Sequence, residues 1–272
     1  MERIKRPERL ALLSAKLSGT PGKLHSLSIW AEEMGCAKSS LSEDVAILKT
    51  IYSEHGLGVI ETLSGAQGGI VFYPELTKRD ISNLVRELCQ LVDQAERILP
   101  GGYIYLTDLV GDPQIMNRVG LFFAQEFRER KPDAVLTVET KGIPIAMMTA
   151  LILNLPLVIV RSDSRISEGT SIGISYLSGT QRRLVTMSLP KRALQKGSKV
   201  VFIDDFLRRG GTASGVLDLI EEFESSCVGM GFLIDIAGED KLVHSYTSLL
   251  TIESIDSEGK QLSVHRGRTL SE

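Results

Sequence analysis

The sequence lacks several motifs by which metal-binding, disulfide-bonded and nucleotide-hydrolysing proteins are recognised. Its three cysteines, Cys36, Cys89 and Cys227, are far apart and never form C-x-x-C. Isolated cysteines in odd number are typical of reduced thiols in a cytoplasmic protein. The four histidines are scattered, so we expect no structural zinc site. No G-x-x-x-x-G-K-[ST] motif occurs, and nothing supports a P-loop NTPase.

Long apolar runs and an excess of basic charge are also missing. The most apolar region, residues 146–160, contains Asn154 and Pro156, which favours a helix, a turn and a buried strand over a membrane span. The apolar segment after the basic N-terminus is too short for a signal peptide. A formal net charge of −3 excludes a globally basic DNA-binding protein but allows one local DNA-binding surface. We therefore expect a cytoplasmic protein without a membrane partner.

The stretch Val200–Ala213 carries the most specific chemical signal. Four apolar residues predict a buried parallel strand, and Asp204 and Asp205 follow at its carboxyl end, where open α/β sheets bind ligands. The glycines of Gly210–Thr212 allow backbone N–H groups to approach a ligand, and the helix that begins there favours an anion. Carboxylates suit the hydroxyls of a ribose, and N–H groups suit its 5′-phosphate. The stretch predicts a ribose-5-phosphate site, with an ordinary strand–turn–helix as the alternative.

Residues 1–74 predict a winged helix-turn-helix DNA-binding domain. Apolar residues at helical spacing indicate three short helices, the first starting near Pro7 and the third with a capping box formed by Ser40 and Glu43. Two short strands, Val59–Leu63 and Ile70–Tyr73, surround a glycine-rich turn and predict a hairpin, the wing.

The third helix and the basic N-terminal segment carry the predicted DNA-binding residues. At 100° per residue, several lysines and small polar residues fall opposite the apolar stripe of the helix. Short hydroxyls allow close approach to a phosphate or a base edge, and lysines neutralise phosphates. The predicted set is Arg3, Arg6, Lys38, Ser39, Ser40, Ser42 and Lys49. The alternative is a solvated helix face in a small dimerisation domain.

Residues 75–272 predict an α/β domain. Residues 75–99 indicate a joining helix, and afterwards strands alternate with helices, which favours a mainly parallel sheet with helices on its faces. The expected strands are Val135–Val138, Leu157–Val160, Val200–Ile203 and Val228–Ile234, and the expected helices are Pro113–Arg130, Ile143–Leu153 and Thr212–Ser225. The segment Ser171–Ser188, with a Ser178-Gly179 turn, alternates polar and apolar residues and predicts an excursion outside the sheet.

Several separated segments resemble known families. The stretch Val200–Ala213 resembles the phosphoribosyl pyrophosphate (PRPP) motif of type I phosphoribosyltransferases. Together with a winged helix, it resembles the PurR family of purine operon regulators of Gram-positive bacteria. The resemblance rests on Ala37–Asp44, Gly65–Gly69, Glu96–Asp108, Thr140–Pro144, Ser175–Gly179, Thr186–Leu189 and the PRPP motif. It implies a winged helix-turn-helix domain followed by a type I phosphoribosyltransferase-like α/β domain that binds an effector and dimerises.

The resemblance also implies roles for residues of the PRPP motif. Asp204 and Asp205 would hold the ribose hydroxyls of PRPP, directly or with Mg²⁺. The segment Arg208–Thr212 would surround the 5′-phosphate. Arg209 departs from the small residue expected before the two glycines, so it would either add a phosphate contact or crowd the loop.

Other expected effector-binding residues lie outside the motif. Lys141 and Gly142 would receive the pyrophosphate, in a loop where a cis peptide is common, and Arg161 would add charge there. Tyr103 and Phe206 would stack on the base of a guanine nucleotide. Alternatively, Lys141 and Arg161 are surface charges and Tyr103 is a core residue. The full expected set is Tyr103, Lys141, Gly142, Arg161, Asp204, Asp205, Phe206, Leu207, Arg208, Arg209, Gly210, Gly211 and Thr212.

The predicted function is a non-catalytic, homodimeric transcription regulator of purine biosynthesis genes, with repression as the expected direction. It would bind double-stranded operator DNA, and PRPP with Mg²⁺ would change its operator affinity. Guanine alarmones such as ppGpp would compete for the site, and no cofactor would be required. Two alternatives stay open from the sequence. One is an active purine phosphoribosyltransferase whose first domain serves dimerisation, and the other is a DNA-binding protein whose second domain is an empty relic.

Overall fold

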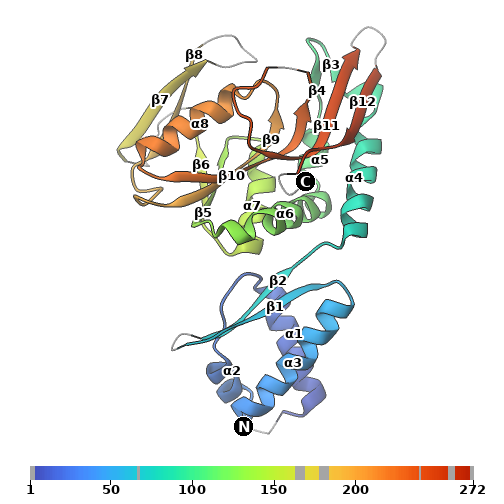
Figure 1. Cartoon of the computed structure of the whole chain (residues 1–272), viewed down its shortest axis with the longest axis vertical. Helices are drawn as coiled ribbons and strands as arrows, with labels where there is room; N and C mark the ends of the chain where they lie inside the picture. The colour runs from blue at the N-terminus through green and yellow to red at the C-terminus, as the bar shows by residue number, and fades with distance from the viewer. Residues whose placement is uncertain are drawn as a thin grey trace. The chain divides into compact units, whose positions relative to one another are not determined.

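A computed structural model describes residues 4–65, 68–162, 169–177, 184–238, 240–256 and 261–269 (Figure 1). The chain divides into two compact units, and along the sequence the division falls between Lys78 and Arg79. Each unit has its own cluster of buried apolar side chains. Among the described residues, no helix is both long enough and apolar enough to cross a membrane.

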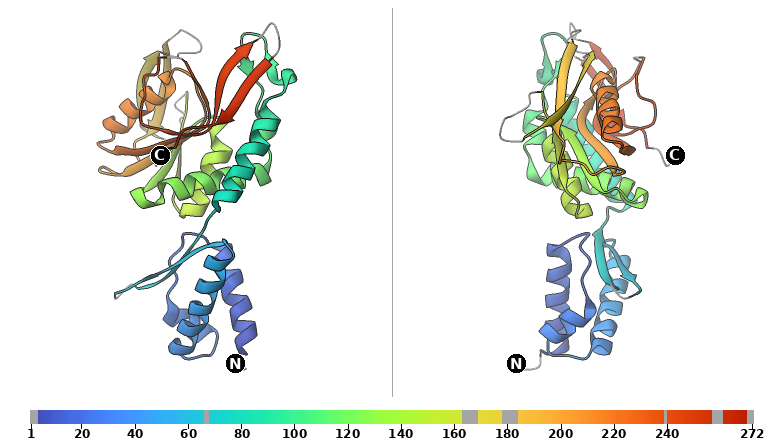
Figure 2. Two further views of the ribbon diagram at one scale, coloured as in Figure 1. Left: turned by 45° about the vertical axis from the view of Figure 1, so that its right-hand side comes forward. Right: turned by 90° about the vertical axis from the view of Figure 1, so that its left-hand side faces the viewer.

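The first unit consists of three helices and a β-hairpin, which confirms the predicted winged helix-turn-helix fold (Figure 2). Its elements are α1 (Arg6–Gly19), α2 (Leu27–Glu33), α3 (Lys38–Glu54) and the antiparallel strands β1 (Gly58–Leu63) and β2 (Gly69–Pro74). Pro7 lies in the first turn of α1, where its missing N–H breaks no helical hydrogen bond. The predicted apolar stripe of α3 is buried: Leu41, Val45, Leu48 and Tyr52.

The start of α3 differs from the prediction. Ala37 is the N-cap residue and no side chain caps the helix there, so the predicted capping box of Ser40 and Glu43 is wrong. Because the helix already includes Lys38, Ser40 lies within its first turn and has helical rather than N-cap geometry. Gly35, by contrast, has a φ of 60° just after α2, as a glycine that ends a helix requires.

The second unit is built on a six-stranded sheet in the order β12-β11-β10-β9-β5-β6. The strands are β5 (Ala134–Val138), β6 (Leu157–Val160), β9 (Lys199–Leu207), β10 (Ser226–Ile236), β11 (Thr247–Asp256) and β12 (Gln261–Arg266). All neighbouring strands are parallel except β11 and β12, which confirms the mainly parallel sheet. β11 and β12 were not predicted.

Helices surround this sheet on both faces. They are α4 (Lys78–Val92), α5 (Thr107–Val110), α6 (Pro113–Phe127), α7 (Gly142–Leu153) and α8 (Gly211–Glu222), with 3-10 turns at Ala95–Arg97 and Arg128–Arg130. α8 packs on the face of the sheet that carries Phe202 and Phe232. α6 packs against β10 through Phe123, whose ring lies where a side chain at Gly231 would be.

Two small antiparallel sheets lie outside the main one. They are β3 (Ile98–Leu99) with β4 (Tyr103–Ile104), and β7 (Ser171–Leu177) with β8 (Leu184–Pro190). The second pair confirms the predicted excursion, although its Ser178-Gly179 turn lies outside the described residues. The β3–β4 hairpin and α5 were not predicted from the sequence.

Candidate effector pocket and DNA-binding surface

Two adjacent carboxyl groups lie at the carboxyl end of β9. Asp204 is buried, with 9% of its surface exposed, and its Oδ1 accepts a hydrogen bond of 2.9 Å from the N–H of Asp205. Burial raises the pKa of Asp204 well above its usual range, and the neighbouring Asp205 raises it further. Burial also raises the pKa of Asp205, against the opposing effects of its contact with Asp204 and the charge of Lys141. Two adjacent carboxylates repel each other, so this pair suits a ligand that donates hydrogen bonds or carries a cation.

The two aspartates line a cavity of about 400 Å³. Its walls come from the end of β5 and the loop after it, from β7 and β10, and from the stretch that runs from the end of β9 into the start of α8. The lining residues are Val138, Glu139, Thr140, Lys141, Tyr176, the segment Asp204–Ala213 and Phe232. The structure therefore brings Lys141 together with all nine predicted residues from Asp204 to Thr212. Glu139, Thr140 and Tyr176 were missed, although the quoted segments Thr140–Pro144 and Ser175–Gly179 contain two of them.

The segment after the aspartates presents the start of a helix to the cavity. Gly210 has a φ of 79°, which favours glycine, and α8 begins at the next residue. The first N–H groups of an α-helix have no acceptor within the helix, and its dipole places partial positive charge there. Gly211, Thr212 and Ala213 supply these N–H groups, and all three line the cavity. The arrangement can bind an anion such as a phosphate.

The loop after β5 approaches the aspartates from the neighbouring strand. The peptide bond between Glu139 and Thr140 is cis. A Cβ atom at Gly142 would lie only 2.4 Å from Oδ1 of Asp204 and 2.3 Å from Oγ1 of Thr137. Only glycine fits at this position, so Gly142 allows the loop and Asp204 to lie side by side. Lys141 then brings a positive charge to the cavity wall.

Three predicted residues, Gly142, Tyr103 and Arg161, are not in the described lining of this cavity. Tyr103 is 49% exposed, so the alternative of a core residue is wrong. Tyr103 lines a smaller adjoining cavity of about 180 Å³, which shares Lys141, Asp205, Phe206 and Arg208 with the larger one. Arg161 is in the described lining of neither cavity, but its guanidinium lies 3.9 Å from the carboxylate of Glu139, which lines the larger one.

The described side chains offer few ligands for a metal ion. No group of three or more histidine, cysteine, aspartate and glutamate side chains converges in the described part of the chain. Asp204 and Asp205 alone would provide one or two oxygen ligands. That number fits Mg²⁺ arriving with a phosphorylated ligand, because Mg²⁺ is usually held by few carboxylates together with ligand phosphates and water.

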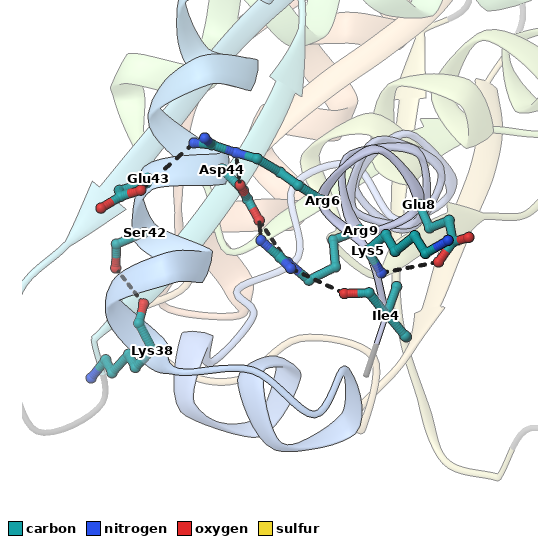
Figure 3. Close-up of polar contacts among 9 residues, drawn as sticks. All are labelled: Ile4, Lys5, Arg6, Glu8, Arg9, Lys38, Ser42, Glu43 and Asp44. Atoms are coloured by element: carbon teal, nitrogen blue, oxygen red, sulfur yellow. Dashed lines mark hydrogen bonds and ion pairs between the residues drawn. The ribbon is translucent and has the colours of Figure 1, made fainter. Parts of the chain in front are cut away.

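The predicted DNA-binding face of α3 is accessible to solvent. Lys38, Ser39, Ser42 and Lys49 are exposed and Ser40 is partly exposed. Ser42 donates a hydrogen bond of 2.9 Å to the carbonyl of Lys38, so both lie on one face of the helix (Figure 3). This exposed polar face opposite a buried stripe is what a recognition helix needs. Arg3, the first residue of the predicted set, lies outside the described residues.

A buried carboxylate on the other side of α3 joins it to α1 (Figure 3). Asp44 is completely buried and accepts hydrogen bonds of 2.9 Å from Arg6 and 2.8 Å from Arg9. Arg9 also donates to the carbonyl of Ile4 at 3.1 Å. Arg6 stays half exposed, and its guanidinium lies 3.6 Å from Glu43. The charge of Arg6 is therefore shared with two carboxylates of α3, which the sequence pattern did not reveal.

Comparisons with known proteins identify both units. Residues 5–74 match the family of bacterial purine repressor N-terminal domains, and residues 107–265 match the phosphoribosyltransferase domain family. Over 269 residues the chain is 42% identical to the purine biosynthesis transcriptional repressor PurR of Bacillus subtilis, covering 98% of this chain and 94% of that protein. The chain belongs to the PurR family. Another PurR relative, the transcriptional activator of Lactococcus lactis subsp. lactis, is 36% identical over 271 residues, covering 99% of this chain and all of that protein.

The second unit of this PurR-family chain is also similar to enzymes. The xanthine phosphoribosyltransferase of Oenococcus oeni is 32% identical over 164 residues, which cover 58% of this chain and 80% of that enzyme. The crystal structure of adenine phosphoribosyltransferase from Thermoanaerobacter pseudethanolicus superposes with a TM-score of 0.51 at 20% identity, covering 61% of this chain and 98% of that one. The superposition confirms the phosphoribosyltransferase fold.

Replacing Asp44 with Asn tests the ion pairs between α1 and α3. The variant leaves the buried guanidinium of Arg9 without its carboxylate, and we expect the first unit to lose about 3–5 kcal/mol of stability. Urea or thermal unfolding of the full chain would measure the loss. Glu43→Gln is the matched control, because this exposed carboxylate is expected to change stability by at most about 0.5 kcal/mol. Equal stability of the two variants would contradict the account.

Proposed function

We propose that this protein binds operator DNA of purine biosynthesis genes through its first unit and senses PRPP through the pocket of its second unit. One observation supports this ligand: Asp204, which is buried, and Asp205, which is partly buried, line the same cavity as the N-terminus of α8. The carboxylates suit the ribose hydroxyls, and the helix N-terminus suits the 5′-phosphate. Lys141 on the opposite loop would face the pyrophosphate. The volume of about 400 Å³ lies within the range of small-molecule sites, roughly 300–1,000 Å³.

The smaller adjoining cavity supports guanine alarmones as competing ligands. Tyr103 and Phe206 line it together with Arg208 and Lys141. The two aromatic rings offer faces on which a purine base can stack, and the two cations suit phosphate groups. A ligand such as ppGpp would occupy the ribose-phosphate cavity and place its base here, so it would exclude PRPP.

The exposed face of α3 supports DNA recognition. Its lysines would neutralise phosphates and its short hydroxyls would approach base edges in the major groove. Residues 1–74 carry eight basic and eight acidic side chains, so non-specific DNA affinity is expected to be weak. A homodimer would present two such helices to two half-sites and double the specific contacts.

Binding of PRPP can regulate DNA binding only if the DNA-bound and free conformations differ in their affinity for PRPP. We propose repression, as the name of the B. subtilis relative suggests, and we further propose that PRPP relieves it. The L. lactis relative is a transcriptional activator, so family members differ in direction.

Purine phosphoribosyl transfer is the competing function, favoured by the similarity to xanthine phosphoribosyltransferase. We propose that the chain is not an enzyme, because the sequence offers no residue that we can assign to activating a purine base. Incubation with PRPP, Mg²⁺ and each common purine base, followed by a pyrophosphate assay, separates the two functions. Turnover of about 1–1,000 s⁻¹ would establish the enzyme.

A gel shift on the upstream region of a purine biosynthesis gene tests the proposed regulation. We expect the protein to bind this DNA and PRPP with Mg²⁺ to weaken the binding by about 5–150-fold, the usual range of allosteric coupling. A shift that does not respond to PRPP would instead indicate a second unit without a sensing function.

Replacing both Asp204 and Asp205 with Asn tests the ligand site. The amides cannot replace the charge of the carboxylates toward ribose hydroxyls or Mg²⁺, so we expect the PRPP response to disappear. DNA binding without PRPP should stay at the wild-type level, because neither residue belongs to the first unit. An unchanged PRPP response in the same gel shift would remove this assignment.

Replacing Lys38 with Ala tests the DNA-binding face. Loss of one phosphate contact should weaken operator binding and reduce the slope of log K against log salt concentration by about one. Fluorescence anisotropy at several salt concentrations would measure both. Lys196→Ala, which removes an exposed lysine of the second unit, is the control that should leave the slope unchanged. A wild-type slope for Lys38→Ala would show that α3 binds DNA in another way or not at all.

A further inference from the structure

We propose that Lys241 is a positioning residue for the phosphate-binding loop, Leu207–Gly210. It directs the loop's carbonyl groups away from the cavity, so that the loop's N–H groups face the 5′-phosphate. This inference rests on the proposed binding of PRPP. Lys241 belongs to the connection between β10 and β11, far from the PRPP motif in the sequence.

The side chain of Lys241 is almost completely enclosed. Only 12% of it is exposed, and its Nζ forms an ion pair of 2.5 Å with Oδ1 of Asp235, a side chain that is 7% exposed. Nζ also donates hydrogen bonds to two backbone carbonyls, that of Arg208 at 3.0 Å and that of Ile236 at 2.5 Å. Two of the three hydrogens of the ammonium group are therefore donated to backbone carbonyls, and the carboxylate of Asp235 adds an ion pair.

The two residues after Lys241 continue the contact with the loop. The N–H of Leu242 donates a hydrogen bond of 2.9 Å to the carbonyl of Arg209. The side chain of Val243 lies behind Gly210, where a Cβ atom would approach its Cγ2 to 3.1 Å. Three consecutive residues therefore support three consecutive residues of the loop.

Because of peptide geometry, these contacts fix the direction in which the backbone N–H groups of the phosphate-binding loop point. In a planar trans peptide, the carbonyl and the N–H that follows it point in opposite directions. Since the carbonyl of Arg208 faces Lys241, the N–H of Arg209 points the other way. The carbonyl of Arg209 faces Leu242, so the N–H of Gly210 likewise points away from residues 241–243. The described cavity lining includes Arg208, Arg209 and Gly210 but not residues 241–243. From this we infer that both N–H groups point toward the cavity.

The position of Lys241 is itself fixed by the sheet. Asp235 lies on β10, and its second oxygen accepts a hydrogen bond of 2.9 Å from the hydroxyl of Tyr246. Burial raises the pKa of Tyr246 far above its usual range, and the hydrogen bond to Asp235 raises it further. Tyr246 therefore remains a hydrogen-bond donor at any physiological pH. Its hydrogen bond fixes the orientation of the Asp235 carboxylate, whose other oxygen pairs with Lys241.

Calorimetric titrations with three ligands test the proposal on the full chain. Ribose 5-phosphate and PRPP use the phosphate-binding loop, whereas pyrophosphate alone would bind at the loop of Lys141. We expect Lys241→Met to weaken ribose 5-phosphate and PRPP by about tenfold or more, which corresponds to one or two lost hydrogen bonds, and to leave pyrophosphate unchanged. Lys241→Arg, which can still pair with Asp235 and donate to a carbonyl, should recover part of the affinity. Lys141→Ala should instead weaken pyrophosphate and PRPP and leave ribose 5-phosphate unchanged.

A double variant distinguishes a specific loss of ligand affinity from a general loss of structure. Lys241→Met leaves the carboxylate of Asp235 buried without its cation, so the double variant with Asp235→Asn removes both charges and keeps an acceptor for Tyr246. Wild-type affinity for ribose 5-phosphate in either folded variant would overturn the proposal. So would an equal loss of all three ligands, which indicates a general structural role. If the wild-type protein binds neither PRPP nor ribose 5-phosphate, the proposed function fails instead.

Discussion

The kind of ligand that the cavity of the second unit can bind depends on two carboxyl groups that lie side by side at the end of β9. Burial and the neighbouring Asp205 raise the pKa of Asp204, and burial raises that of Asp205, so ionising both carboxyl groups is unfavourable. A ligand with hydroxyl groups would donate hydrogen bonds to the two carboxylates, and a ligand with Mg²⁺ would bring a positive charge to them. Either would stabilise the ionised carboxylates, which have few such partners in the protein. The N-terminus of α8 lies in the same cavity and prefers the opposite kind of group, an anion. A sugar phosphate would provide both kinds of group, which is why we propose it as the ligand.

Glycines and backbone hydrogen bonds in the surrounding segments hold the two aspartates and the N-terminus of α8 in place. Gly142 lets the loop after β5 lie against Asp204, and Gly210 takes a backbone conformation that favours glycine. The carbonyls of the phosphate-binding loop are engaged from behind by Lys241 and Leu242. In the first unit a comparable buried charge, Asp44, joins α1 to α3 and so fixes the helix that carries the predicted DNA-binding face. In both units a buried carboxylate determines where the functional groups lie.

Much of this could be predicted from the sequence, because the signals are local. The apolar run, the two aspartates and the two glycines of the PRPP motif are adjacent along the chain, and the stripe of α3 repeats at helical spacing. Contacts between distant residues could not be predicted. Asp44 pairs with arginines 35 and 38 residues away, and Lys241 contacts a loop 33 residues away. The capping box failed for a related reason, since α3 begins earlier than its local pattern suggests, and Glu43 lies near Arg6 instead. The exposure of Tyr103 follows from a short hairpin that left no periodic signal.

The central claim is that the sugar-phosphate pocket and the DNA-binding surface are thermodynamically coupled. Calorimetric titration of PRPP with Mg²⁺ into the free protein, and into the protein saturated with operator DNA, tests it most directly. Linkage requires that DNA change the affinity for PRPP by the same factor by which PRPP changes the affinity for DNA. We predict weaker PRPP binding to the DNA complex, by that factor. Equal dissociation constants for the two forms, or no detectable heat with either, would contradict the account.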